Sequence, residues 1–211
     1  MKVTVLGPTG ATGEQIVRQA LAAGYDVTAV ARRAEAVAIT DPKLRAVSGN
    51  VLDSASLLDA IVGADAVLSG LGSREMNRPT TVYSEGVVAV ITAMHEAGVR
   101  RFIGVTAVPV APDEQKSPLS RYVVHPLLHQ FFSGAYDDMR RMERLLAASD
   151  VDWTVFRPPR LTHAAATRRY RTAVDASLPR AFTVSRADLA AAIVGAIGDR
   201  ALFRHAVTIA D

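Results

Sequence analysis

The residues with the clearest chemistry lie near the start of the chain, where glycine recurs at every third position. Gly7, Gly10 and Gly13 follow a short apolar run and precede a stretch with helical spacing. In such a turn the first glycine allows the bend, the second lets backbone approach a diphosphate, and the third lets the helix pack on the strand. Residues 7–13 are therefore predicted to bind a dinucleotide at a helix start. A tight turn without a ligand is the alternative.

Two arginines stand where the ribose of such a cofactor is usually recognised. The second apolar run ends in Val30, Ala31, Arg32 and Arg33, without the carboxylate that would hold the ribose hydroxyls of NAD. Paired guanidinium groups can instead clamp a 2′-phosphate through charge-assisted hydrogen bonds. The pattern predicts NADPH as the cofactor, with NADH as the second choice. A solvated basic turn is the alternative interpretation of the two arginines.

Loops with small residues follow the third and fourth apolar runs. Ser48, Gly49, Asn50 and Val51 come where the adenine ring would lie, and the Asn50 amide can both accept and donate a hydrogen bond. Residues 69–74 form a second glycine-rich segment, on the side of an open α/β sheet where ligands bind. An ordinary flexible loop is the alternative for this second segment.

Other polar side chains give weaker signals. His125 and His129 are four residues apart and would share one helix face, but the nearby sequence offers no third ligand, so no metal site is predicted. Asp137 and Asp138 are expected at a helix start, where they would interact with the helix dipole as caps.

These residues need a scaffold in which strands end together. Short β-branched runs alternate with stretches of helical spacing, which is typical of parallel strands joined by crossover helices. We therefore predict an α/β fold, a Rossmann-type doubly wound parallel sheet in three α/β/α layers. The expected strands span residues 2–6, 26–31, 44–48, 66–69, 101–106 and 152–156, and the expected helices span residues 13–23, 54–61, 81–97, 136–148 and 185–197.

The chain has the length of one large domain of this kind. We expect a single NAD(P)-binding Rossmann domain over residues 1–211, with a C-terminal substrate-side portion at about 107–185. Residues 109–126 are expected to form a loop over the mouth of the site. Ser185 and Asp188 have the spacing of a helix-capping box.

Composition narrows the function classes. The 211 residues include no cysteine, which excludes disulfides, thiolate zinc sites and cysteine nucleophiles. The formal charge is +3, but the arginines are scattered and not interleaved with aromatic residues, so no nucleic-acid partner is expected. No segment approaches about 18 apolar residues in a row, and the apolar run before Gly7 is too short for a signal peptide. A cytoplasmic protein without a membrane partner is expected.

Several motifs together resemble one known family. They are GPTGATG, ARR, GNVLD, LGSR followed by PTTVYSEG, HEAGVRRFIGVTA and DVDWTVFRPPRLT. These motifs are similar to those of the atypical short-chain dehydrogenases/reductases, and within that group to the NAD(P)H-binding proteins of the flavin reductase and biliverdin reductase B type. The resemblance covers nearly the whole chain. It implies NADPH-linked hydride transfer to a flavin or a tetrapyrrole on a compact scaffold.

The resemblance also implies roles for individual residues. It assigns the diphosphate to the glycine-rich turn, the 2′-phosphate to the two arginines, adenine to the loop after the third strand, and the nicotinamide to the ends of later strands. The implied cofactor-binding residues are Gly7, Thr9, Gly10, Ala11, Thr12, Gly13, Arg32, Arg33, Asn50, Val51, Leu71, Gly72, Ser73, Thr106, Ala107, Pro158, Pro159, Arg160 and Leu161.

The sequence departs from the family pattern at the polar positions. Asn50 stands where aspartate is usual, and Ala107 stands where serine is frequent. The superfamily's usual proton donor is a tyrosine four residues before a lysine, whereas Tyr136 is followed at that spacing by an arginine. The register of the helix indicates that the usual pair falls on Ala135 and Met139. Tyr136 is therefore a candidate catalytic acid, with packing or substrate lining as the alternative.

Two classes of function fit these residues. The first is an NAD(P)H-dependent oxidoreductase that transfers hydride to a flavin, quinone or similar planar acceptor, with Phe131 or Phe132 available for stacking. The second is a non-catalytic NAD(P)-binding sensor that acts through a protein partner. An isomerase or epimerase is disfavoured because no sugar-nucleotide domain follows the sheet. A monomer or weak homo-oligomer is expected.

Overall fold

One large sheet organises the protein. The structure is a computed structural model that describes residues 1–72, 79–112 and 125–211, with side chains for all of these except 125–133. Strands hydrogen-bond in the order β3-β2-β1-β4-β5-β6-β10-β8, and a small sheet pairs β7 with β9. Their bounds are β1 Lys2–Leu6, β2 Asp26–Ala31, β3 Leu44–Ser48, β4 Ala66–Ser69, β5 Arg101–Val105, β6 Asp152–Arg157, β7 Arg160–Thr162, β8 Arg171–Val174, β9 Thr183–Ser185 and β10 His205–Ala210.

The chain direction in this sheet determines where its ligand edge lies. Neighbouring strands are parallel throughout the large sheet, except that β8 runs antiparallel to β10. The strand order reverses at the β1–β4 pair, because β2 and β3 lie on one side of β1 and the later strands lie on the other. In open α/β sheets, ligands bind outside the carboxyl ends of the strands at such a reversal.

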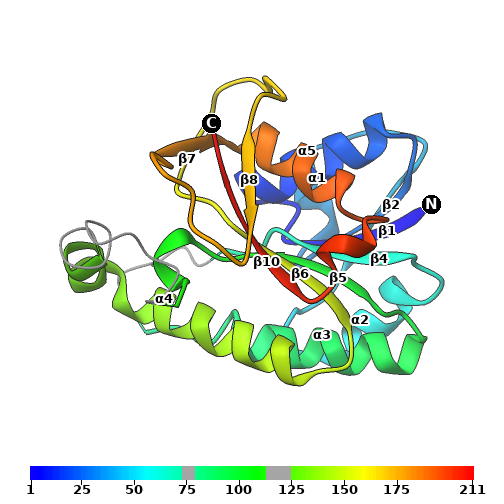
Figure 1. Cartoon of the computed structure of the whole chain (residues 1–211). Helices are drawn as coiled ribbons and strands as arrows, with labels where there is room; N and C mark the ends of the chain where they lie inside the picture. The colour runs from blue at the N-terminus through cyan, green and yellow to red at the C-terminus, as the bar shows by residue number, and fades with distance from the viewer. Residues whose placement is uncertain (73–78, 113–124) are drawn as a thin grey trace.

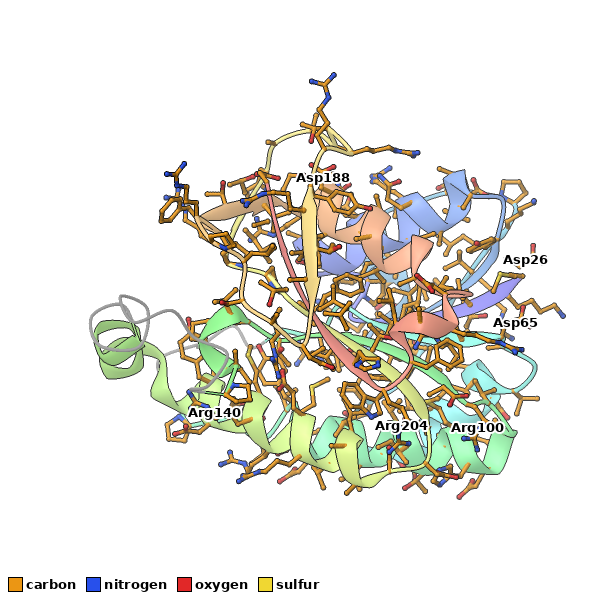
Figure 2. All side chains as sticks on the ribbon, viewed as in Figure 1. Asp26, Asp65, Arg100, Arg140, Asp188 and Arg204 are labelled. Atoms are coloured by element: carbon orange, nitrogen blue, oxygen red, sulfur yellow. The ribbon has the colours of Figure 1, made fainter. Side chains whose placement is uncertain are left out.

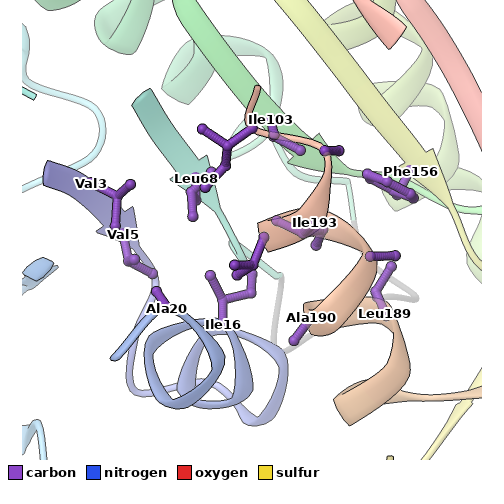
Figure 3. Close-up of a cluster of buried hydrophobic side chains, with 14 of the residues drawn as sticks. Val3, Val5, Ile16, Ala20, Leu68, Ile103, Phe156, Leu189, Ala190 and Ile193 are labelled. Carbon is purple, nitrogen blue, oxygen red and sulfur yellow. The ribbon is translucent and has the colours of Figure 1, made fainter. Parts of the chain in front are cut away.

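Helices cover both faces of the sheet (Figure 1). The bounds of the α-helices are α1 Ala11–Ala22, α2 Ser54–Ile61, α3 Ser84–Ala97, α4 His125–Ala148 and α5 Arg186–Gly195. One core packs α1 and α5 on the sheet, as Figure 3 shows for Ile16 and Ile193 facing Val5 and Leu68. The other core joins α2, α3 and α4 to the opposite face. The predicted three-layer Rossmann-type fold is confirmed. Among the described helices, none combines the length and apolar content needed to cross a bilayer.

The buried strands follow the sequence prediction closely. All six predicted strands are present, and only β5 and β6 differ, by one residue each at the carboxyl end. Five of them were predictable because a strand buried on both faces is a continuous apolar run. The sixth, β3, lies at the edge of the sheet and has no buried residue. The prediction missed β7, β8, β9 and β10. The first three are only three or four residues long, and their pairing depends on distant segments, such as the register of Arg160 with Thr183.

Helix α4 is the main departure from prediction. It begins at His125, eleven residues before the predicted start at Tyr136, so the last two residues of the predicted loop over residues 109–126 belong to the helix. The part of that loop from 113 to 124 lies outside the described residues, and Val108–Val110 form a short 3₁₀ helix. Pro126 is compatible with this start because a helix tolerates proline in its first turn.

The early start of α4 also corrects the role of Asp138. We expected Asp138 to cap its own helix, but it lies in the middle of α4 and is fully buried. Its carboxylate accepts hydrogen bonds from the backbone N–H groups of Tyr83 (2.8 Å) and Ser84 (3.3 Å) and from the Ser84 hydroxyl. Asp138 therefore caps the neighbouring helix α3, whose own N-terminal residue provides no side-chain cap.

A second buried carboxylate fixes the start of α5. Ser185 caps this helix as predicted, because its hydroxyl accepts from the Asp188 N–H at 2.9 Å. The Asp188 carboxylate accepts from the backbone N–H groups of Thr167 (2.9 Å) and Arg168 (2.7 Å) and from the Ser185 hydroxyl (2.8 Å). Burial acts to raise the pKa of Asp188, but these hydrogen bonds outweigh it and hold the pKa below its usual value. Asp188 thereby ties the loop before β8 to the helical layer.

Replacing Asp188 by Asn is expected to destabilise the protein by about 2–3 kcal/mol at pH 7, because buried N–H groups lose a charged acceptor. A carboxylate with a lowered pKa stabilises the fold above its unfolded pKa, and this contribution is lost as pH falls through the folded pKa. The difference between wild type and D188N, measured by urea unfolding, should therefore shrink below about pH 4. The control is Asp26→Asn, an exposed position (Figure 2). A pH-independent difference would contradict the assignment.

Candidate functional site

The turn between β1 and α1 is built so tightly that two of its glycines are required by the fold. Gly7 has a φ of +72°, a conformation that favours glycine. A Cβ atom on Gly13 would lie 2.0 Å from the Gly7 carbonyl oxygen, which no rearrangement of a side chain can relieve. The geometry of the turn alone therefore explains why positions 7 and 13 are glycine.

Gly10 has no such internal reason. Its φ of −86° is open to any residue, and among the described residues a Cβ atom there would meet only the Gly7 oxygen at 3.5 Å and the Gly70 oxygen at 4.0 Å. Gly10 is the N-cap of α1, and no side chain in the described part of the protein caps this helix start. The first N–H groups of a helix have no acceptor within the helix and attract anions. Residues 7–13, which we call the diphosphate cradle, therefore fit a diphosphate, because the absent side chain at Gly10 keeps the approach open.

The second glycine-rich segment is pressed against the cradle. A Cβ atom on Gly70 would lie 2.7 Å from the Gly13 Cα, so the end of β4 and the start of α1 touch through backbone alone. Leu71 is half-buried and packs on the α2–α3–α4 core, whereas Gly72 is exposed. Ser73, which the resemblance assigns to the cofactor, lies outside the described residues.

Arg32 and Arg33 lie directly after β2, at the same edge of the sheet. Both side chains are exposed, and neither guanidinium is engaged by another described residue. The Ser48 hydroxyl accepts from the Ala34 N–H at 3.2 Å, which joins this turn to the end of β3. Two arginines without a partner among the described residues therefore lie at the same sheet edge as the cradle. Their binding of a 2′-phosphate stays a prediction.

Asn50 lies in the loop after β3, where adenine is expected. Its side-chain oxygen accepts from the Leu52 N–H at 3.2 Å, and its backbone N–H donates to the Ser56 hydroxyl at 3.0 Å. The Asn50 oxygen therefore already accepts one hydrogen bond within the loop, so the side-chain N–H₂ group is the one that could donate to adenine. Val51 beside it is half-buried.

A polar cluster that the sequence did not reveal lies at the ends of β5 and β6. Thr106 Oγ1 donates to Glu143 Oε1 at 2.7 Å, and Arg157 donates to both Glu143 oxygens at 3.0 and 2.6 Å. Arg157 and Thr106 are buried and Glu143 is nearly so. This arrangement pins α4 to the ligand edge of the sheet. In the sequence, this cluster is indicated only by a glutamate on the apolar side of a helix, and that does not show which residues it would bind.

Tyr136 lies in the apolar core formed with α3 and is 8% exposed. Burial raises the pKa of its phenol, and the neighbouring Tyr83 raises it further. The residue four positions later, Arg140, hydrogen-bonds Asp137 at 2.8 Å and the Pro109 carbonyl at 3.0 Å (Figure 2). These surroundings favour a packing role for Tyr136, and a role as catalytic acid stays a prediction.

The segments expected around the nicotinamide come together in the fold. The Thr106 N–H donates to the Phe156 carbonyl at 2.9 Å, and the Val108 N–H donates to the Pro158 carbonyl at 3.0 Å. Ala107 and Pro158 therefore lie on adjacent strand ends, followed by Pro159, Arg160 and Leu161 where β7 begins.

Phe182 is an exposed aromatic residue that the sequence analysis missed. It directly precedes β9, so it lies beside the start of β7, and it is 75% exposed. The backbone around it is held in place, because Arg171 donates to the carbonyls of Pro179 (2.9 Å) and Asp211 (2.7 Å). The side chains of the predicted stacking residues Phe131 and Phe132, and those of the His125–His129 pair, lie outside the described residues.

Comparison with known proteins agrees with this geometry. A family model described as NAD(P)H-binding matches residues 7–200. Photosystem II assembly factor Ycf39 of Synechocystis sp. is 28% identical over 158 residues, which are 74% of this chain and 43% of that protein. The chain spans less than two thirds of the length of the first curated relatives that it matches.

Solved structures share the whole fold at low identity. The oxidoreductase ylbE of Lactococcus lactis superposes with a TM-score of 0.82 at 20% identity, covering 100% of this chain and 91% of that one. A short-chain dehydrogenase/reductase of Veillonella parvula, solved in complex with NADP, gives a TM-score of 0.81 at 18% identity, covering 100% and 94%. The likeness to the flavin reductase type stays a prediction. With its Rossmann sheet, open diphosphate cradle and near full-length family match, this chain belongs to the NAD(P)H-binding family.

Proposed function

We propose that this protein is an NADPH-dependent oxidoreductase that transfers hydride to a planar acceptor such as a flavin or a quinone. One observation carries the proposal: Gly10 borders open space at an uncapped helix start, although nothing in the described chain requires glycine there. The exposed pair Arg32 and Arg33 supports NADPH over NADH, because paired guanidinium groups match a phosphate.

The chain's own contribution is binding and alignment. The bound nicotinamide would supply the hydride. The cradle holds the diphosphate, and the ends of β5 and β6 form the wall on which the nicotinamide ring would rest. The Thr106–Glu143–Arg157 cluster keeps that wall fixed relative to α4, because three hydrogen bonds converge on one carboxylate. Holding donor and acceptor in register is itself a large part of such catalysis.

The proton that accompanies the hydride comes from solvent in this proposal. Thr106 already donates its hydroxyl proton to Glu143, and that carboxylate is also paired with Arg157. Burial raises the pKa of Tyr136, which makes its phenol a weaker acid. Neither group is therefore suited to donate a proton near neutral pH.

An acceptor with a flat ring system fits the surface beside the wall. Phe182 presents an aromatic face next to β7, and Arg160 opens β7 as an exposed residue with a guanidinium group. Both groups stack on planar partners, and the guanidinium also binds anionic substituents.

A non-catalytic sensor is the second candidate. Ala135 and Met139 occupy the positions of the superfamily's tyrosine and lysine, and both are buried. The matched Synechocystis relative carries the name of an assembly factor, which is a role exercised through protein partners. A sensor would need the cradle but no acceptor surface.

Substituting Gly10 by Ala tests the cradle directly. The fold has room for the new methyl group, so stability should change by about 1 kcal/mol or less. The methyl group would occupy the approach of the diphosphate, so the Kd for NADPH, measured by calorimetry, should rise at least about tenfold. Gly13→Ala is the contrasting variant, with an expected loss of about 3 kcal/mol from its clash with Gly7. Unchanged NADPH affinity in folded G10A would contradict the cradle.

Replacing Arg32 and Arg33 together by Ala should weaken NADPH binding about 10- to 100-fold and leave NADH binding within about twofold, because only the 2′-phosphate is lost as a partner. Arg200→Ala, at an exposed position on a distant 3₁₀ helix, is the control. Equal losses for both cofactors would rule out recognition of the 2′-phosphate by this pair.

Turnover separates the two candidate functions. Purified protein is mixed with NADPH and a panel of flavins, quinones and bilins, and the loss of nicotinamide absorbance is followed. A reductase turns over at least one acceptor. Y136F should then keep kcat within about twofold, because Tyr136 is not the proton donor in this proposal. F182A should raise the KM for the acceptor about tenfold, since a stacking surface is worth roughly 1 kcal/mol or more. Tight NADPH binding with no turnover on any acceptor would support the sensor.

A further inference from the structure

Strand β8 forms one edge of the large sheet. It pairs antiparallel with β10 on one side, and no described strand follows it on the other (Figure 1). Strands β10, β6, β5 and β4 separate it from β1 and the diphosphate cradle. An edge strand presents backbone N–H and C=O groups with which another peptide chain can pair.

The register with β10 indicates which backbone groups of β8 face outward. In an antiparallel pair, residues alternate between hydrogen-bonding the partner strand and facing away from it. The Asp175 N–H, directly after β8, donates to the Ala206 carbonyl at 2.8 Å, so Ala173 faces β10 in the same way. The alternation therefore turns the N–H and C=O groups of Thr172 and Val174 outward. No loop, helix or side chain in the described parts of the chain hydrogen-bonds these outward groups.

Little in β8 protects this edge against pairing. Natural edge strands are often guarded by proline, a bulge or a charged side chain, and β8 has neither proline nor a bulge in its register. Its one charged residue, Arg171, is turned back onto the chain and donates to the carbonyls of Pro179 (2.9 Å) and Asp211 (2.7 Å). Val174, by contrast, is 43% exposed. The edge is therefore open and carries an accessible apolar side chain.

The segment that contains β8 is strongly basic. Residues 160–186 include six arginines, no lysine and one carboxylate, a formal charge of +5, whereas the whole chain carries +3. The single carboxylate, Asp175, is paired with His205. The rest of the chain is therefore slightly acidic, and the positive charge is concentrated around this edge.

Three exposed arginines lie near the start of β8. Arg168 and Arg169 precede the strand by three and two residues, and the Arg168 N–H is held by the buried Asp188 at 2.7 Å. The Arg180 carbonyl accepts from the Arg171 guanidinium at 3.4 Å, which brings residue 180 to the same end of the strand. None of the three exposed arginines makes an ion pair within the part of the chain that the structure describes. Their charges are available to an anionic partner.

We propose that the β8 edge binds an extended, acidic segment of a partner protein, which adds a strand to the large sheet. The outward backbone groups of Thr172 and Val174 supply hydrogen bonds, and the Val174 side chain supplies an apolar contact. The arginines at the start of β8 bind carboxylates of the segment and thereby select acidic sequences. The inference uses only this edge, so it is independent of the proposed function.

Other partners fit the surface less well. A membrane or a nucleic acid would use the arginines and leave the outward N–H and C=O groups of β8 unpaired. A second copy of this chain would bring its own basic segment against the first, and like charges oppose such a contact. An acidic strand uses both the backbone edge and the charge.

A synthetic peptide tests the edge directly. The probe alternates valine and threonine, carries glutamates at both ends, and is titrated into the intact protein by calorimetry. We expect a Kd of about 10–100 μM, which rises with salt. The same peptide N-methylated at every valine and threonine keeps its charge but loses its backbone donors, so its Kd should be at least about tenfold higher.

Variants of the protein separate the backbone from the charges. T172P removes one outward N–H, and an edge strand tolerates proline where its N–H faces away from the sheet. T172P should remain folded by urea unfolding and raise the peptide Kd at least about tenfold, whereas T172A keeps the N–H and should change the Kd less than about threefold. R169E/R180E should raise the Kd about tenfold, and the control R169K/R180K, which keeps both charges, less than about threefold.

Hydrogen exchange in the unsubstituted protein gives a test that does not depend on the folding of any variant. When the peptide binds, the amides of Thr172 and Val174 should exchange at least about tenfold more slowly, because they gain acceptors. The amide of Ala173, which faces β10, should change less than about twofold.

Four results would each overturn the inference: no binding at about 1 mM peptide, equal affinity for the N-methylated peptide, full affinity in folded T172P, or unchanged exchange at Thr172 and Val174. Binding of phosphatidylserine vesicles or single-stranded RNA without binding of the peptide would assign the arginines to that ligand instead.

Discussion

The close contact of three backbone segments at the ligand edge governs the rest of this structure. The turn after β1, the first residues of α1 and the end of β4 meet at Gly7, Gly13 and Gly70, with no side chain between them. Because these segments cannot separate without opening the core, the start of α1 is fixed at the point where the strand order reverses. In the proposed function, a diphosphate bound there would need no adjustment of the chain. The other candidate site residues lie near this turn because their strands end at the same edge of the sheet.

The site combines a rigid frame with little acid–base chemistry. Glu143 accepts a hydrogen bond from Thr106 at the ends of β5 and β6, and its negative charge is paired with Arg157. The tyrosine that stands near the superfamily position is buried and has a raised pKa. A frame of this kind suits reactions in which the cofactor carries the chemistry, and it suits recognition without reaction equally well. The choice between reductase and sensor therefore rests on the acceptor side, where Phe182 is the distinguishing feature.

Whether an element could be predicted from the sequence depends on how far apart in the chain the residues that form it lie. The central strands, the glycine turn and the Ser185 cap are encoded in a few adjacent residues, and the sequence indicated all of them. Strands β7 and β9 exist because segments more than twenty residues apart pair, and the Glu143–Arg157 pair joins a helix to a strand end. Neither leaves a periodic signal. The start of α4 was missed because its first turns contain proline and adjacent aromatic residues, which are weak indicators of a helix.

Asp138 links two helices through a bond between residues 54 apart in the chain, and this has a consequence for how the molecule assembles. The first turn of α3 gains its acceptor only when α4 has docked alongside it. Local helix formation by α3 is therefore incomplete in any state that lacks α4, so the two helices behave as one cooperative folding unit. Fluctuations that detach α4 would fray α3 at the same moment, and the ligand edge would loosen with them.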